Sequence, residues 1–414
     1  MGRHHLSRRN PLVLTQAIRG YNINMEKTRS GAQDIAKGLM IIAVVFFHCY
    51  IETFENHGDS IKDFNILVAC FPFILSTFFF YAGYNYTPNG RTYKENILRR
   101  AKQLLIPFAV AFLISTVLIS CMELAFHHDD PSATFHAIGN SVLYGLMSEP
   151  MALMIGFPQE GGIIFELILA LCLLWFLYAL FFCSLLFYWL VKYTNKKRST
   201  LISVVVALLI IAFCIGQFVG TYLPYQVESY PVILAIMLVA AYLRKSNFLD
   251  RPVEGKKGVV FLILNALLAE GLIIGASFVL NACFGTTTAG SLPSGLFDPA
   301  IRGFDAFVAF AFGLLGIYFV HTLSRGIARV PILGTCLQWL GKRSAIFYLF
   351  HPIFLELAAI AIFQKKIPWG RGQAFFYVAV VLAALTLTCL LIEWIAKKIR
   401  SKKKESEAGV SDGQ

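Results

Sequence analysis

Three ionisable residues, Lys37, His48 and His351, lie in or at the edge of long apolar stretches of the sequence. Ionisable side chains are costly to place inside a membrane, so those found there usually have a function or a partner. The imidazole ring of histidine can accept a proton near neutral pH, as a general base does. A lysine at the edge of such a stretch can bind phosphate oxygens. The set therefore predicts a site where a proton is moved close to a bound anion.

The segment from Asp34 to His48 places three of its polar residues on one face of a helix. At 100° per residue, the steps from Lys37 to His48 return to within about 20° of the same direction, and Asp34 lies within about 40° of it. The helical rise puts His48 roughly 16 Å beyond Lys37 along the axis. We therefore expect Lys37 at the membrane surface and His48 near the middle of the bilayer.

Each of these residues also has a simpler interpretation. His48 could only hydrogen-bond another helix, and His351 could serve helix packing. Lys37 could be an ordinary positive anchor at the membrane surface, and Arg99 and Arg100 could only set the topology.

Other polar residues in or near the apolar stretches carry weaker predictions. Three acids lie in the apolar stretches: Glu166, Glu270 and Glu356. The simpler interpretation of each is that it pairs with another residue or lines a cavity. One of them could instead orient His48 or bind an acceptor. His321 lies near the end of its stretch, where it can be solvated. The contiguous run His127–Asp130 has poor spacing for a rigid metal site, and the nine cysteines form no CxxC pair. We therefore expect no metal centre.

The composition predicts an all-α integral membrane protein. Of the 414 residues, 57% are hydrophobic and only 14% are charged, whereas a soluble domain carries about 25% charged residues. A helix needs about 20 apolar residues to cross a bilayer. Ten segments fit this requirement: 36–54, 66–86, 104–126, 163–190, 200–220, 230–243, 258–280, 303–323, 344–363 and 374–396. The sixth is short and follows Pro224 and Pro231, so we expect it to be broken or tilted.

The basic residues assign the loops to the two sides of the membrane. Ten crossings place both termini on one side, and the loops on that side hold all but five of the 36 Lys and Arg residues. The five exceptions are Lys62, Arg302, Lys365, Lys366 and Arg371. Since positive loops remain in the cytoplasm, both termini are predicted to be cytoplasmic. Basic loops beside an anionic leaflet also explain the net charge of +12 without a nucleic acid partner.

Five segments, in chain order, carry a family resemblance. They are Lys37 and His48 with ten residues between them, the run Phe78-Phe79-Phe80-Tyr81-Ala82-Gly83-Tyr84, the stretch Arg100–Pro107, the triplet Trp175-Phe176-Leu177, and Gly341-Lys342-Arg343-Ser344 followed by Tyr348 and His351. Together they resemble membrane-bound acyltransferase family 3, whose members O-acylate cell-envelope carbohydrates and related acceptors. The chain departs from the family pattern at Ala82, where Ser is usual, and at Gln103, where a second Arg is frequent.

The resemblance implies a function and roles for the candidate residues. It implies an acyl-CoA donor, most simply acetyl-CoA, used as a co-substrate and not as a permanently bound cofactor. The acceptor would be a hydroxyl group of an envelope glycan, a lipid-linked sugar or a similar molecule, and the location would be the cell membrane among its lipids. His48 would be the general base. Donor binding or support is expected from a second set: Lys37, Asp34, Arg99, Arg100 and His351.

Ten helices with buried acids would also suit a secondary transporter or an exporter of a polysaccharide or lipid precursor. Transporters often carry paired, interrupted helices in two halves, and the sequence has no such pairing. An enzyme is therefore the favoured interpretation.

The chain divides into a cytoplasmic segment, 1–33, a transmembrane acyltransferase domain, 34–397, and a basic cytoplasmic tail, 398–414, which is expected to be disordered. Met25 and the residues after it resemble a family N-terminus, so a chain that starts at Met25 is expected to insert and work.

Reporter fusions test the predicted topology. A reporter fused after residue 195 or after residue 255 should lie in the cytoplasm, because basic loops surround both positions. A reporter fused near Asp130 should lie outside. If fusions at Asp130 and Lys197 report the same side, the number of crossings is wrong.

Overall fold

The computed structural model describes residues 31–55, 73–87, 90–126, 139, 175–219, 224–250, 255–284, 303–363 and 371–411. Regular structure within these ranges is helical throughout. The helices are α2 (Gly31–Glu55), α4 (Ile74–Tyr84), α5 (Tyr93–Phe126), α8 (Trp175–Thr194), α9 (Arg198–Cys214), η2 (Ile215–Val219), η3 (Pro224–Ser229), α10 (Tyr230–Ser246), α11 (Gly255–Phe284), α12 (Asp305–Ile327), α13 (Pro331–Lys342), α14 (Ser344–Phe363) and α15 (Arg371–Ser411).

The helices confirm an all-α protein of the multi-pass membrane class. Among the described residues, eight helices are long and apolar enough to cross a bilayer, and two shorter apolar helices cover 74–84 and 344–355. All ten of these helices overlap the segments expected from the sequence. The number of crossings and the side of each terminus stay predictions.

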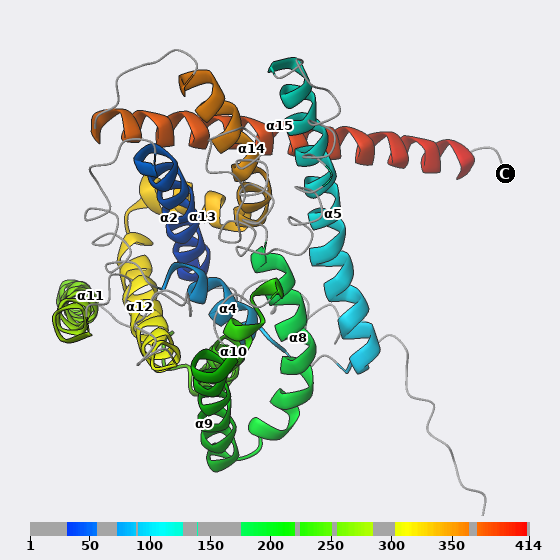
Figure 1. Cartoon of the computed structure of the whole chain (residues 1–414). Coiled ribbons are helices and arrows are strands. Elements are labelled where there is room, and N and C mark those ends of the chain that lie inside the picture. The colour runs from blue at the N-terminus through cyan, green and yellow to red at the C-terminus, as the bar shows by residue number, and fades with distance from the viewer. Residues whose placement is uncertain are drawn as a thin grey trace, which may run out of the picture.

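Two helices, α2 and α10, lie inside the bundle, and others lie at its edge (Figure 1). Helix α10 is the more deeply buried of the two, and α2 contacts α4, α12, α13, α14 and α15. By contrast, α11 and α15 expose rows of leucine, valine and phenylalanine side chains. Exposed apolar side chains on a long helix are the surface that lipid covers.

Close helix contacts depend on glycines that lie between two backbones. A Cβ atom on Gly38 of α2 would collide with the carbonyl oxygen of Leu337 in α13. In the opposite direction, a Cβ on Gly341 would collide with the carbonyl oxygen of Asp34. Gly83 of α4 lies equally close to Met237 of α10. Small residues at helix crossings let backbones approach, which is the usual way in which membrane helices pack.

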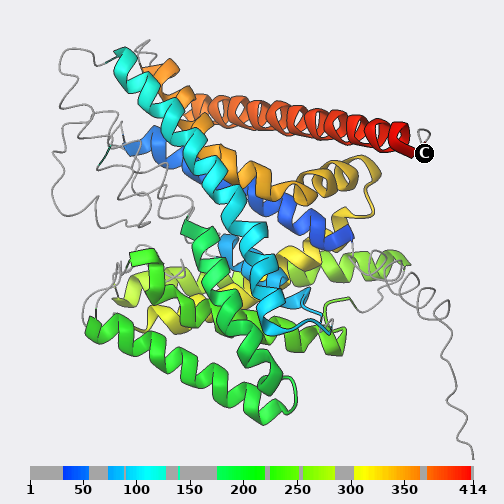
Figure 2. The same cartoon turned by 90° about the vertical axis from the view of Figure 1, so that its right-hand side faces the viewer.

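Three parts of the described chain differ from the sequence expectation. Residues 331–342, expected to be a loop, form α13, which buries Leu337 against α2 and exposes Ile332 at 82%. The sixth segment is not short, because η3 leads into α10 and the apolar helix covers Val227–Ser246. Helix α15 continues to Ser411 through the tail that was expected to be disordered (Figure 2). Its Lys, Glu and Ala residues are strong helix formers, and the apolar part of the helix supplies the nucleus for their turns.

Substitution of Gly38 tests the contact between α2 and α13. Gly38→Ala should lower the melting temperature in detergent and reduce the amount of folded protein, because a backbone carbonyl cannot move aside as a flexible side chain can. The expected loss is about 1–3 kcal/mol, as for other overpacked positions. Gly275→Ala is the matched control, since a Cβ at Gly275 meets no described atom within 4 Å. Equal melting temperatures for both variants would contradict the contact.

Candidate functional site

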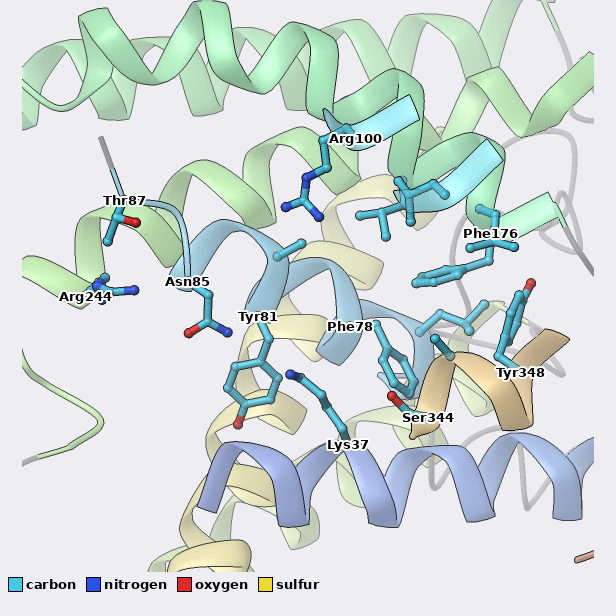
Figure 3. A pocket seen from close by; sticks show the side chains of 16 residues that line it. Lys37, Phe78, Tyr81, Asn85, Thr87, Arg100, Phe176, Arg244, Ser344 and Tyr348 are labelled. Atoms are coloured by element: carbon cyan, nitrogen blue, oxygen red, sulfur yellow. The ribbon is translucent and has the colours of Figure 1, made fainter. Parts of the chain in front are cut away.

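A cavity of about 390 Å³ lies between α2, α4, α5, α8, α10 and α14 (Figure 3). The polar side chains of Asn85, Thr87, Arg100 and Arg244 lie toward one end. Toward the other end lie the rings of Phe78, Phe176 and Tyr348. A cavity with a charged part and an apolar part suits a ligand that has both characters.

Three basic residues line the cavity, and each comes from a different helix: Lys37 from α2, Arg100 from α5 and Arg244 from α10. Arg100 donates a hydrogen bond from Nε to the hydroxyl of Tyr188 at 2.8 Å. Arg244 donates from Nη1 to the carbonyl oxygen of Tyr84 at 2.8 Å. Because these acceptors are neutral, they hold the guanidinium groups in place without neutralising them. The arrangement can bind an anion such as a phosphate.

Lys37 lies between a carboxylate and an aromatic ring. Its Nζ atom is 3.8 Å from Oδ1 of Asp34, one helical turn earlier on α2, and 5.8 Å from the centroid of the Tyr81 ring. The exposed fraction of its side chain is 13%. Contact with the face of an aromatic ring favours a cation, so Lys37 is held as a charged group in the cavity wall.

His48 and His351 come together although they are about three hundred residues apart in the chain. Their ring centroids are 5.2 Å apart, with α2 supplying one ring and α14 the other. Neither ring lines the cavity, but the ring of Tyr348, which does, lies 5.5 Å from that of His351. The histidine pair is therefore one aromatic ring behind the cavity wall.

Pro352 explains how the His351 ring is oriented. In an α-helix, the backbone N–H of residue 352 would donate to the carbonyl oxygen of Tyr348, but proline has no N–H. His351 uses the carbonyl that is left over, because its Nδ1 lies 2.7 Å from the Tyr348 oxygen. A carbonyl only accepts hydrogen bonds, so Nδ1 must carry the proton, and in the neutral ring Nε2 keeps the lone pair. Nε2 is buried and has no hydrogen-bond partner among the described residues.

Comparison with protein families decides the classification. A family model for the acyltransferase domain of acyltransferase family 3 matches residues 31–393. The chain belongs to this family. It is therefore a multi-pass membrane acyltransferase. Comparisons with curated proteins and with solved structures found no significant match.

The structure of this acyltransferase shows which of the residues singled out by the sequence lie near the cavity. Asp34, Lys37 and Arg100 lie at or beside the cavity, and His48 and His351 form the pair behind it. Arg99 is exposed on α5 and does not line the cavity.

Three other predictions, on Glu166, on the side chain of Glu356 and on the run His127–Asp130, fall outside the described residues. Glu270 is half-buried on α11, away from the cavity lining. The described residues contain no group of three potential metal ligands.

Sequence reasoning missed three residues of the site. Arg244 was counted only among the basic residues that set topology, and Tyr81 only as part of an aromatic run. His321 was expected to be solvated, but it is buried at 1% exposure and contacts Tyr81. The sequence held one indication of Arg244, because it follows an apolar helix directly, but that position is also typical of a topology signal.

Two adjacent arginines provide a matched test of anion binding. Arg100→Ala should weaken the binding of inorganic pyrophosphate about 10-fold or more, because a charge-assisted contact is lost. Arg99→Ala removes the same charge from the same turn of α5 but should leave binding near the wild-type level. Binding can be measured with purified protein in nanodiscs by calorimetry or by protection against thermal unfolding. Equal losses in both variants would mean that only the total charge matters.

Proposed function

We propose that this membrane acyltransferase transfers an acetyl or other acyl group from acyl-CoA to a hydroxyl group of an envelope glycan, a lipid-linked sugar or a similar acceptor. The observation that carries the proposal is a cavity with three basic residues that lies one aromatic ring away from a histidine pair. The proposed place of action is the cell membrane, with the donor taken from the cytoplasm.

The cavity suits the two chemical parts of coenzyme A. Its phosphates are anionic, and Lys37, Arg100 and Arg244 can bind them through charge-assisted hydrogen bonds. The pantetheine arm is long and uncharged, and its methyl and methylene groups fit the walls formed by Phe78 and Phe176. An arm that runs beside Tyr348 brings the thioester toward the histidine pair.

The histidine pair suits the chemical step. His48 accepts the proton of the acceptor hydroxyl while the hydroxyl oxygen attacks the thioester carbonyl carbon. A C–O bond forms and the C–S bond breaks, so the acyl group becomes an ester. The imidazolium of His48 then gives its proton to the leaving thiolate, and free coenzyme A departs. No protein nucleophile is needed for this sequence.

We assign the base to His48 because it shares α2 with Lys37, so one rigid helix relates donor binding to the base. His351 supports the base from α14, where the Tyr348 carbonyl fixes its ring. The orientation of His351 also makes its Nε2 able to accept a proton, so His351 is the second candidate for the base. Separate substitution of the two residues decides between them.

His48→Ala should lower turnover about 10²–10⁴-fold, the usual contribution of a general base. Membrane abundance and donor binding should stay normal, since Lys37 and the cavity are unchanged. His351→Ala should act mainly on donor affinity or on thermal stability. The measurement is transfer from radiolabelled acetyl-CoA by purified variants in nanodiscs, with donor binding followed separately.

Near-normal turnover of His48→Ala would remove His48 from the catalytic role, and a loss of turnover in His351→Ala alone would assign the base to His351. A wild-type protein that binds but never consumes acetyl-CoA in the presence of acceptor would favour the transporter interpretation.

A further inference from the structure

A chain of polar contacts starts at the cavity wall and ends in the turn after α10. The hydroxyl of Tyr81, on α4, is 2.9 Å from Nδ1 of His321, on α12. On the other side of the same ring, Nε2 of His321 is 3.5 Å from Oδ1 of Asp250. Tyr81 and His321 are each exposed by only 1%. These three residues are called the Asp250 relay below.

The charge of Asp250 decides where the protons of the relay lie. The contact with Nε2 of His321 and the hydrogen bond from the hydroxyl of Tyr84 hold the pKa of Asp250 below its ordinary value, against the opposing effect of partial burial. A carboxylate next to Nε2 favours the tautomer that carries its proton on Nε2. In the neutral ring with this tautomer, Nδ1 of His321 accepts and the hydroxyl of Tyr81 donates. The relay therefore has one direction, from Tyr81 through His321 to Asp250.

This direction fixes the ring that faces Lys37. With its hydroxyl held by His321, the Tyr81 ring keeps its place in the cavity wall, 5.8 Å from Nζ of Lys37. The ring and Asp34 confine the ammonium group to the cavity. If the ring turned away, Lys37 would lose its aromatic contact and its side chain would be less ordered before a ligand binds. Ligand binding would then carry a larger entropic cost, because it would have to order this side chain.

Asp250 also holds a second basic residue of the cavity. Its Oδ2 accepts a hydrogen bond of 2.6 Å from the hydroxyl of Tyr84, in the last turn of α4. The carbonyl of Tyr84 in turn accepts the hydrogen bond from Arg244. The turn that carries Asp250 is itself tied to α12, because Arg325 donates from Nη1 to the carbonyl of Leu249 at 3.0 Å. One carboxylate thus ties the end of α4 to both α10 and α12.

We infer that the Asp250 relay is a positioning device that holds Lys37 in the cavity as a binding group for phosphate oxygens of the donor. The identity of the donor rests on the proposed function, but the inference about anion binding does not depend on acyl transfer. Asp250, His321 and Tyr81 act through Lys37 and are positioning residues, not catalytic ones.

Tyr81→Phe is the most informative variant, because it removes the hydroxyl and keeps the ring. It should raise the dissociation constant for inorganic pyrophosphate about 3- to 10-fold, as expected for one buried hydrogen bond. Asp250→Ala should raise it at least as much, and Asp250→Asn, which keeps an acceptor oxygen, should raise it less. The matched control is Tyr377→Phe, which removes an equally buried hydroxyl that donates to the carbonyl of Leu355 at 2.6 Å, away from the cavity.

A double-mutant cycle separates positioning from a general effect on stability. Lys37→Met should weaken pyrophosphate binding, and Tyr81→Phe in that background should add less than about a 2-fold change. In acyl transfer, Tyr81→Phe should raise the KM for acyl-CoA and change kcat less than about 2-fold. The inference would be overturned if the fold-changes in the dissociation constant caused by Tyr81→Phe and Lys37→Met multiplied in the double variant. It would also be overturned if Tyr81→Phe and Tyr377→Phe bound pyrophosphate equally well.

The two proposals fail in different ways. A wild-type protein that binds pyrophosphate with this pattern but transfers no acyl group would overturn the proposed function and leave the relay in place. A wild-type protein that binds neither pyrophosphate nor coenzyme A would overturn the relay. If Asp250→Ala does not fold, Asp250→Asn and Tyr81→Phe carry the test.

Discussion

The backbone contact between α2 and α13 at Gly38 and Gly341 fixes the position of the helix on which the site depends. Neither glycine leaves room for a Cβ atom, and the atoms that a Cβ would meet are backbone atoms. Helix α2 therefore has one position against α13, and Lys37 is the residue just before the contact. Along the same helix, His48 then meets His351 of α14. A shift of α2 would move Lys37 and His48 together.

Helix α14 shows how a local defect in a helix can orient a functional group. Pro352 removes one backbone donor, which would cost stability if the freed carbonyl remained unpaired. His351 satisfies that carbonyl and in return is held in one tautomer. One turn of α14 thus supplies the ring from His351, the break in the ladder from Pro352 and the acceptor from Tyr348. The result is a fully buried imidazole of fixed orientation.

The fold class and the two candidate histidines could be predicted from sequence because both follow from the cost of placing polar groups in a membrane, whereas the contact between the two histidine rings could not. That cost makes His48 and His351 conspicuous in apolar segments, and it fixes the length of the helices. The roles of Tyr81, Arg244 and His321 could not be predicted, since each depends on which helix packs against which. The α13 helix was missed for a related reason. In the sequence, a segment this short resembles a loop, and only its packing on α2 distinguishes it from one.

The partners of the arginines separate groups that bind from groups that hold the fold together. Arg343 donates to the carboxylate of Glu393 at 2.7 Å and stacks on Trp339 at 4.4 Å, so its charge is compensated and it ties α15 to the end of α13. Arg100 and Arg244 are instead anchored by a phenol and a carbonyl, which leave their charge available. Among the described residues neither guanidinium forms an ion pair, and in a cavity with low dielectric such a group attracts an anion strongly. Under the proposed function the negatively charged donor occupies this cavity, and the histidine pair behind it carries out the proton chemistry without competing for that ligand.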